Sequence, residues 1–297
     1  MTDLLEAPAP APAASGGPAA ASRRGRRGLP FSPWHLLLAP TAIVFAIPFV
    51  EMFLASLTPA ADLVQVPTPL IPSTLTLAGY ASLVTTSPVL LWLGNTLVVA
   101  GTAIVSHLVL CSLAGYGFAR LRFRGRNLGF FGIVATIMIP TQVLMIPTYV
   151  LFSRIGLLDS LGAAIVPWLA SAFGIFLMRQ FFLSLPLELE EAGLLDGCTR
   201  RQVFFRIVLP LAKPALATLA IFTLLGSWND LVWPLIAINN DQAFTLQLGI
   251  TTFQGARRTE WSLLMAANVV ATLPLILFFL VAQKQFIATM TFSGLKG

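Results

Sequence analysis

Six stretches of the chain are long and apolar enough to cross a membrane, and they constrain the fold more than any other feature. A spanning α-helix needs about 20 mainly apolar residues, since the bilayer interior holds no water to hydrogen-bond an open backbone. Only 10% of the 297 residues are charged, against about 25% in a typical soluble domain. The six segments are 34–57, 93–117, 129–152, 162–183, 215–237 and 263–283. The sequence therefore predicts an all-α integral membrane protein with six transmembrane helices.

The basic residues predict the orientation of these helices. Fifteen of the 18 Lys and Arg residues fall in or beside the segments that lie inside when both termini are cytoplasmic. Only Arg154, Arg257 and Arg258 then face outside. The positive-inside rule therefore places both termini in the cytoplasm, and it explains the basic composition without a nucleic-acid partner.

The remaining segments connect the predicted spans. Residues 1–30 are rich in Ala, Pro, Gly and Ser, which predicts a disordered cytoplasmic tail, and residues 284–297 form a second cytoplasmic tail. The outer connections 58–92 and 238–262 are long enough to touch an external partner. Cys111 and Cys198 lack the spacing of a zinc or redox motif, so no metal or cofactor is expected on this chain.

The inner connection 184–214 carries the most information. Pro186 and the carboxylates that follow it are typical of the first turn of a helix, where they meet the positive end of its dipole. The pair Asp196-Gly197 predicts a tight turn that ends this short helix.

A second short helix is predicted directly after this turn. Thr199 and Gln202 have the spacing of a capping box, and Leu209-Pro210 is expected to stop the helix. Two short helices around a glycine turn fit either an interfacial hairpin or a docking platform for a cytoplasmic protein.

The residues of this loop resemble the EAA loop of ABC importer permeases. That pattern is E-A-A, three residues, Gly, nine residues and I-x-L-P; the chain has Glu191-Ala192-Gly193, then Gly197, then Ile207-Val208-Leu209-Pro210. Gly193 departs from the second alanine but keeps the side chain small. The resemblance implies that the loop couples to an ATPase through Glu190, Glu191, Ala192, Gly193, Asp196, Gly197, Ile207, Leu209 and Pro210.

Other segments are similar to the second permease subunit of maltose-type carbohydrate importers. They are 116–126, 138–142, 156–159, 228–230, 233–235 and 296–297. The resemblance implies the type I ABC importer permease fold in a prokaryotic cytoplasmic membrane. It also implies a second six-span permease, two cytoplasmic ATPase subunits that use ATP and Mg²⁺, and an extracytoplasmic sugar-binding protein.

The chain has no G-x-x-x-x-G-K-[ST] sequence, so it is not expected to be the ATPase or another enzyme. The predicted function is therefore that of a sugar permease subunit forming half of the translocation pathway. Glycerol phosphate import is the alternative within the family. A secondary transporter is the alternative outside it, with Glu51 and His107 as the ionisable groups within spans.

Polar and aromatic residues inside the spans are candidates for the substrate pathway, because polar groups are costly against lipid. Each of them also fits a structural role, as an interhelical hydrogen bond or an interfacial tryptophan. The candidates are Trp228, Asn229, Asp230, Trp233 and Asn268.

Overall fold

The computed structural model describes residues 34–65, 72–255 and 259–294, with side chains up to residue 280. The predicted tail 1–30, Arg257, Arg258 and the terminal pair 296–297 lie outside the described residues. The chain divides into two units, residues 1–47 and 48–297. The first unit contributes only the beginning of α1 (His35–Ser56) to the described part.

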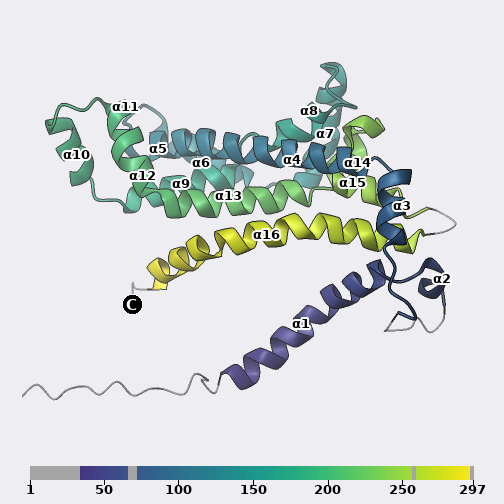
Figure 1. Cartoon of the computed structure of the whole chain (residues 1–297). Helices are drawn as coiled ribbons and strands as arrows, with labels where there is room; N and C mark the ends of the chain where they lie inside the picture. Colours follow the sequence, from purple (N-terminus) through teal and green to yellow (C-terminus); the bar gives the residue numbers. More distant parts are fainter. Residues whose placement is uncertain (1–33, 66–71, 256–258, 295–297) are drawn as a thin grey trace, which may run out of the picture. The chain divides into compact units, whose positions relative to one another are not determined.

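The described residues form helices and no strand (Figure 1). Four helical stretches are long and apolar enough to span a membrane: His35–Ser56, Val89–Arg120, Leu161–Ser184 and Trp261–Leu280. Two bent helix pairs raise the possible number to six. The elements after α1 are α2 (Ala60–Leu63), α3 (Ala78–Thr86), α4 (Val89–Ser106), the π-helix η1 (His107–Cys111), α5 (Ser112–Arg120), α6 (Arg126–Thr136), α7 (Thr141–Arg154), α8 (Leu161–Ile165), the 3₁₀-helix η2 (Val166–Trp168), α9 (Ala172–Ser184), α10 (Glu188–Leu195), α11 (Arg200–Val203), the π-helix η3 (Phe204–Val208), α12 (Leu209–Leu211), α13 (Lys213–Trp228), α14 (Val232–Ala237), the 3₁₀-helix η4 (Asp241–Ala243), α15 (Leu246–Thr251) and α16 (Trp261–Gly294).

Segment 129–152 is not one continuous helix in the structure. α6 and α7 meet at an angle of 99°, and Pro140 caps the start of α7 with an extended backbone (ψ 131°). A proline has no N–H to donate to the preceding turn, and its ring blocks that turn, so a helix ends readily before it. Segment 215–237 is divided as well, because residues 229–231 separate α13 from α14.

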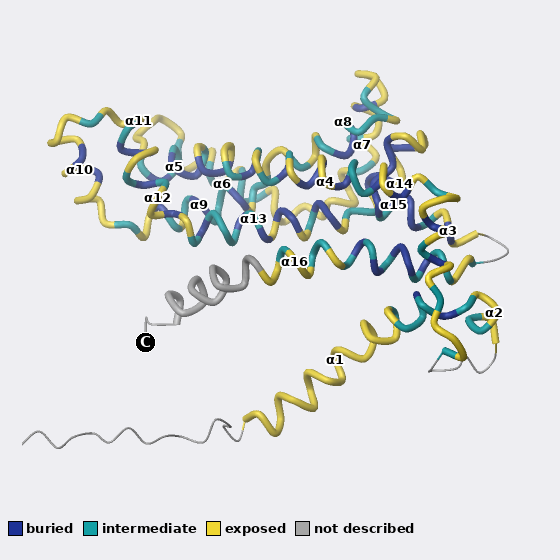
Figure 2. The backbone as a smooth tube through the Cα atoms, in the orientation of Figure 1, coloured by how far each residue is buried: buried dark blue, intermediate teal, exposed yellow. Residues whose placement is uncertain are grey.

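The core of residues 48–297 gathers into two main groups of buried side chains. One group surrounds Trp92 and Trp233, and the other surrounds Tyr116 and Phe182. Within this unit α5 packs on α9, and α13 packs on both α4 and α16. Figure 2 shows the buried stretches running along these helices, whereas α10 is mostly exposed.

The connection 238–262 is folded onto α4. The Asn95 side chain donates hydrogen bonds of 2.9 Å to the backbone oxygens of Gln242 and Phe244. The backbone N–H of Leu246 donates to Thr96 Oγ1 at 2.7 Å. Residues 243–246 are buried, so this part of the connection belongs to the core.

Candidate functional site

The first short helix of the 184–214 loop is α10, which begins at Glu188, two residues after Pro186. Its carboxylates lie in the first turn, where they interact favourably with the helix dipole. Gly197 follows the helix in the left-handed conformation (φ 85°). The backbone N–H groups of Gly197 and Cys198 donate to the oxygens of Leu194 and Gly193, which is a Schellman motif. The predicted turn at Gly197 is thus confirmed.

The capping box that starts the second helix is confirmed. Thr199 Oγ1 accepts from the Gln202 backbone N–H at 3.3 Å, and Gln202 Oε1 accepts from the Thr199 backbone N–H at 2.8 Å. The second helix ends at Leu211, one residue beyond the predicted stop at Leu209-Pro210. The proline is accommodated in the first turn of α12, directly after the π-helix. The chain then bends by 74° into α13.

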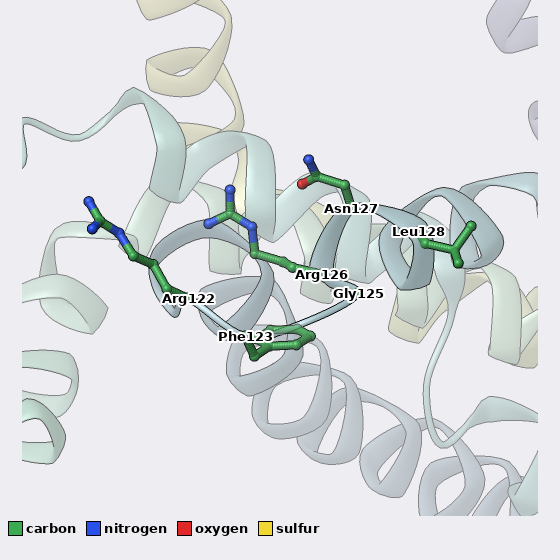
Figure 3. Close-up of a pocket in the computed structure, with 6 residues that line it drawn as sticks. All are labelled: Arg122, Phe123, Gly125, Arg126, Asn127 and Leu128. Carbon is green, nitrogen blue, oxygen red and sulfur yellow. The ribbon is translucent and has the colours of Figure 1, made fainter.

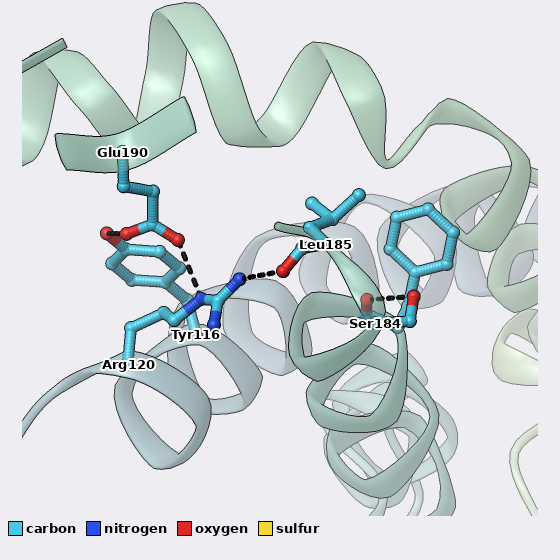
Figure 4. Close-up of polar contacts among 6 residues, drawn as sticks. Tyr116, Arg120, Ser184, Leu185 and Glu190 are labelled. Atoms are coloured by element: carbon cyan, nitrogen blue, oxygen red, sulfur yellow. Dashed lines mark hydrogen bonds and ion pairs between the residues drawn. The ribbon is translucent and has the colours of Figure 1, made fainter. Parts of the chain in front are cut away.

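Glu190 ties α10 to the end of α5. Its carboxylate forms an ion pair with Arg120 Nε at 2.6 Å and accepts a hydrogen bond from Tyr116 Oη at 2.8 Å (Figure 4). Arg120 Nη2 also donates to the backbone oxygen of Leu185 at 2.7 Å, just before α10 begins. The side chains of Arg120 and Glu190 are 11% and 9% exposed, so this ion pair is shielded from water. The loop is therefore held in one position by charge as well as by packing.

Gly193 lets α10 lie close to the second helix. A Cβ atom at this position would meet Ile207 Cδ1 at 2.5 Å and Val203 Cγ2 at 3.3 Å. Beneath this contact the Tyr116 ring packs against Phe182 and Phe204, with ring centroids 5.7 and 4.8 Å away. The second helix of the loop therefore shares one core with the ends of α5 and α9, and α10 packs on this core at Gly193.

The other side of α10 is open. Glu191, Ala192 and Asp196 are exposed, and the apolar side chain of Leu195 is 89% exposed. Six of the residues assigned to coupling from the sequence thus fall into two groups. Glu190, Gly193 and Ile207 hold the loop together, whereas Glu191, Ala192 and Asp196 are exposed beside Leu195, which was not among the assigned residues. Leu195 stands out by its exposure, which the sequence pattern did not reveal.

The two candidate tryptophans of the substrate pathway are buried. Trp228 donates its indole N–H to the Ala271 oxygen at 3.1 Å, and Trp233 donates to the Ala163 oxygen at 2.8 Å. Both side chains therefore connect helices in the core.

The polar candidates differ in their surroundings. Asp230 accepts a hydrogen bond from the Trp168 indole at 2.9 Å, and Asn268 donates to the Leu264 oxygen of its own helix at 2.8 Å. Asn229 is exposed, and its Oδ1 accepts from Gln247 Nε2 at 3.5 Å. Of these five candidates, Asn229 is the one that is exposed.

The two ionisable residues considered for a secondary transporter differ in their burial. His107 is buried, and its Nδ1 donates to the Ala103 oxygen at 3.0 Å. Glu51 is exposed on α1. A buried histidine bonded to its own helix fits a structural role.

Residues 108–291 match the family described as the binding-protein-dependent transport system inner membrane component. The chain is 34% identical over 277 residues to the arabinooligosaccharides transport system permease protein AraQ of Halalkalibacterium halodurans, covering 92% of this chain and 99% of that protein. It is 34% identical to the sn-glycerol-3-phosphate transport system permease protein UgpE of Pectobacterium atrosepticum, covering 88% and 96%.

The fold is also similar to a solved structure. A chain of a bacterial ABC transporter involved in the import of the acidic polysaccharide alginate aligns with a TM-score of 0.74 and 24% identity. The alignment covers 86% of this chain and 98% of that one. The all-helical architecture is thus that of a type I ABC importer permease.

Proposed function

Since the chain belongs to the binding-protein-dependent transport system inner membrane components and is an ABC importer permease subunit, we propose that it forms half of a pathway for a mono- or oligosaccharide. The permease resides in the cytoplasmic membrane as a multi-pass protein, and ATP hydrolysis belongs to a separate subunit. The similarity to permeases named for arabinooligosaccharides and lactose supports a sugar as the substrate.

The observation that carries the mechanism is the two-sided character of α10. Its inner side is fixed to α5 by the ion pair between Glu190 and Arg120, and its outer side presents Glu191 and the bare apolar side chain of Leu195. Leu189 and Leu194 of the same short helix are also exposed, by 43% and 42%. Several exposed apolar side chains with charged residues around them are typical of a site that a protein partner covers. An ATPase subunit that uses ATP and Mg²⁺ would dock here, and its movement would pass through the shared core to α5 and α9.

The orientation follows from the same site. In this proposal α6 with α7 forms one span and α13 forms another, which gives six spans with the four long helices and places both termini in the cytoplasm. Arg120, Arg122, Arg124 and the arginines of α11 then lie together on the cytoplasmic side. The loop 184–214 is consequently within reach of a cytoplasmic ATPase.

The partners in this proposal are a second permease subunit, two ATPase subunits and an extracytoplasmic sugar-binding protein. One coupling loop per chain implies a pair of permeases, which would enclose the pathway between them. A structurally similar alginate transporter was solved in complex with a pentasaccharide-bound periplasmic protein, which supports the last partner.

Asn229 and Gln247 favour a neutral solute over glycerol phosphate. Their uncharged amides lie together at the end of α13, where Asn229 is exposed. Amides suit the hydroxyl groups of a sugar, whereas a phosphate ester is recognised mainly by arginine, lysine or backbone N–H groups. In this proposal Asp230 and Asn268 contribute further polarity to the pathway.

The test is ATP hydrolysis by the complete importer in proteoliposomes, with its binding protein and a panel of sugars or glycerol 3-phosphate. We expect one sugar to stimulate hydrolysis. Asn229→Ala should raise the sugar concentration needed for half-maximal stimulation by about tenfold, which corresponds to the loss of one or two hydrogen bonds. Stimulation by glycerol 3-phosphate and by no sugar would overturn the assignment of the substrate.

A further inference from the structure

The turn between α5 and α6 forms a shallow basic cavity apart from the coupling loop. The cavity has a volume of about 450 Å³ and is lined by Arg122, Phe123, Gly125, Arg126, Asn127 and Leu128. Gly125 adopts a left-handed conformation (φ 82°), which reverses the chain between the two helices. Figure 3 shows the guanidinium groups of Arg122 and Arg126 and the amide of Asn127 extending to the same side of this turn.

The positive charges of this turn are not neutralised by the described part of the chain. Arg122 and Arg124 are exposed, and neither they nor Arg126 pairs with a described carboxylate. Arg126 donates one hydrogen bond to the Leu121 oxygen at 3.3 Å. By contrast, the charge of the neighbouring Arg120 is neutralised by its ion pair with Glu190.

A further guanidinium approaches the turn from α9. Arg179 is held in place by a hydrogen bond of 3.2 Å from its Nε to the Phe118 oxygen and by the Phe130 ring, 3.9 Å from its Cζ. Arg126 lies four residues before Phe130 on α6, so its side chain is on the side of that helix that Arg179 contacts. Two like charges held near each other by separate helices attract an anion.

Exposed apolar side chains adjoin the charges. Phe123 is 50%, Leu128 77% and Phe131 69% exposed, and the last two continue along α6. A surface that joins arginines to such residues matches the boundary between lipid headgroups and acyl chains. A soluble anion would need only the charges, and a soluble protein partner would not require the apolar surface to continue along a predicted span.

We propose that the α5–α6 turn binds the phosphate headgroup of an anionic phospholipid through Arg122 and Arg126, with Phe123 and Leu128 against its acyl chains. The lipid would fill the cavity at the end of α5, whose lining begins two residues after the Arg120 that anchors the coupling loop. The site does not depend on which solute the permease transports.

The experiment measures lipid binding to the assembled importer in neutral detergent, by native mass spectrometry with short-chain phosphatidylglycerol, short-chain phosphatidylcholine or inorganic phosphate as probes. We expect phosphatidylglycerol to bind in preference to the other two.

Arg126→Gln should weaken phosphatidylglycerol binding about fivefold, and the double variant Arg122→Gln, Arg126→Gln should weaken it about 25-fold. Replacing both arginines with lysine keeps the charge, so the affinity for phosphatidylglycerol should stay within a few-fold of the wild-type value. The matched control Arg154→Gln removes one exposed charge from the end of α7 and should leave the affinity for phosphatidylglycerol unchanged.

Four results would overturn the proposal. One is unchanged phosphatidylglycerol affinity in the double glutamine variant. Another is equal binding of inorganic phosphate, which would make this a site for a free anion. The third is loss of the ATPase subunits from the glutamine variants at unchanged lipid occupancy, which would make it a protein contact. Wild-type complex supplies a test without substitutions, because affinity that stays the same between 50 and 500 mM salt excludes a headgroup held by charge.

Discussion

Glu190 and Glu191 are neighbours in the sequence, yet they face different surroundings. Successive residues of an α-helix point about 100° apart, so only one of the two side chains is directed at the end of α5. Glu190 reaches Tyr116 and Arg120, whereas Glu191 is exposed. The same motif therefore contains an anchor and a contact surface.

Glu190→Gln should destabilise the permease much more than Glu191→Gln. The first substitution leaves the Arg120 guanidinium nearly buried without its counterion, which costs about 3 kcal/mol. The second changes an exposed residue and should cost less than about 0.5 kcal/mol. Denaturant titration of the purified complex measures both changes, and equal stability of the two variants would show that the ion pair does not hold the loop.

The sequence motif could not separate these two roles. It predicted the helix, its carboxylates and the glycine turn, because those depend on residues only a few positions apart. The partner of Glu190 lies 74 positions away at Tyr116, and no local pattern links the two. Leu195 was missed for a similar reason, since its exposure depends on which side of α10 packs against the second helix.

At the scale of whole elements, α5 and α9 approach closely at one glycine. A Cβ atom on Gly115 would lie 2.7 Å from Met178 Cβ and 2.9 Å from the Arg179 backbone nitrogen, neither of which moves without its helix. The close packing of α5 on α9 near the coupling loop therefore requires a residue without a Cβ atom at position 115. Gly117 in the same helix has nothing within 4 Å of such an atom.

Gly115→Ala should force α5 and α9 apart and destabilise the complex by about 1–3 kcal/mol. Gly117→Ala makes the same chemical change where there is space, so it should be neutral or stabilise by up to about 1 kcal/mol through its helix propensity. Thermal unfolding of the two variants in detergent compares them directly. A drop in melting temperature for Gly117→Ala as large as for Gly115→Ala would contradict the close packing.

Prolines show the limit of predicting elements from sequence. Pro147 and Pro274 lie inside continuous helices, whereas Pro140 stands at a 99° bend. A missing N–H weakens a helix at each of these positions, but the neighbouring helices decide whether it bends. The capping box at Thr199 and Gln202 was predictable because both of its hydrogen bonds are local.

At the scale of the molecule, the coupling loop and the helices from α4 onward belong to one unit within residues 48–297. The core around Tyr116 and Phe182 contains residues from α5, α9 and the second loop helix, and α10 is joined to it through Glu190 and Gly193. In our proposal a displacement of α10 would therefore be passed to the spans. The six apolar segments were enough to predict a membrane protein. The pairing of α5 with α9 and the buried ion pair needed the three-dimensional structure.

We propose that the outer face of α10 receives the ATPase, and Leu195→Ala changes this face without touching the ion pair that holds the loop. The measurement is ATP hydrolysis by the reconstituted importer with loaded binding protein. The control is Leu90→Ala, which changes an exposed leucine at the start of the helical stretch Val89–Arg120, whereas the coupling loop packs near the end of that stretch. We predict that Leu195→Ala lowers stimulated hydrolysis about tenfold, equivalent to losing one buried side-chain contact of about 1.4 kcal/mol, while the permease remains folded. Stimulated hydrolysis equal to that of Leu90→Ala and of the unmodified importer would contradict the claim.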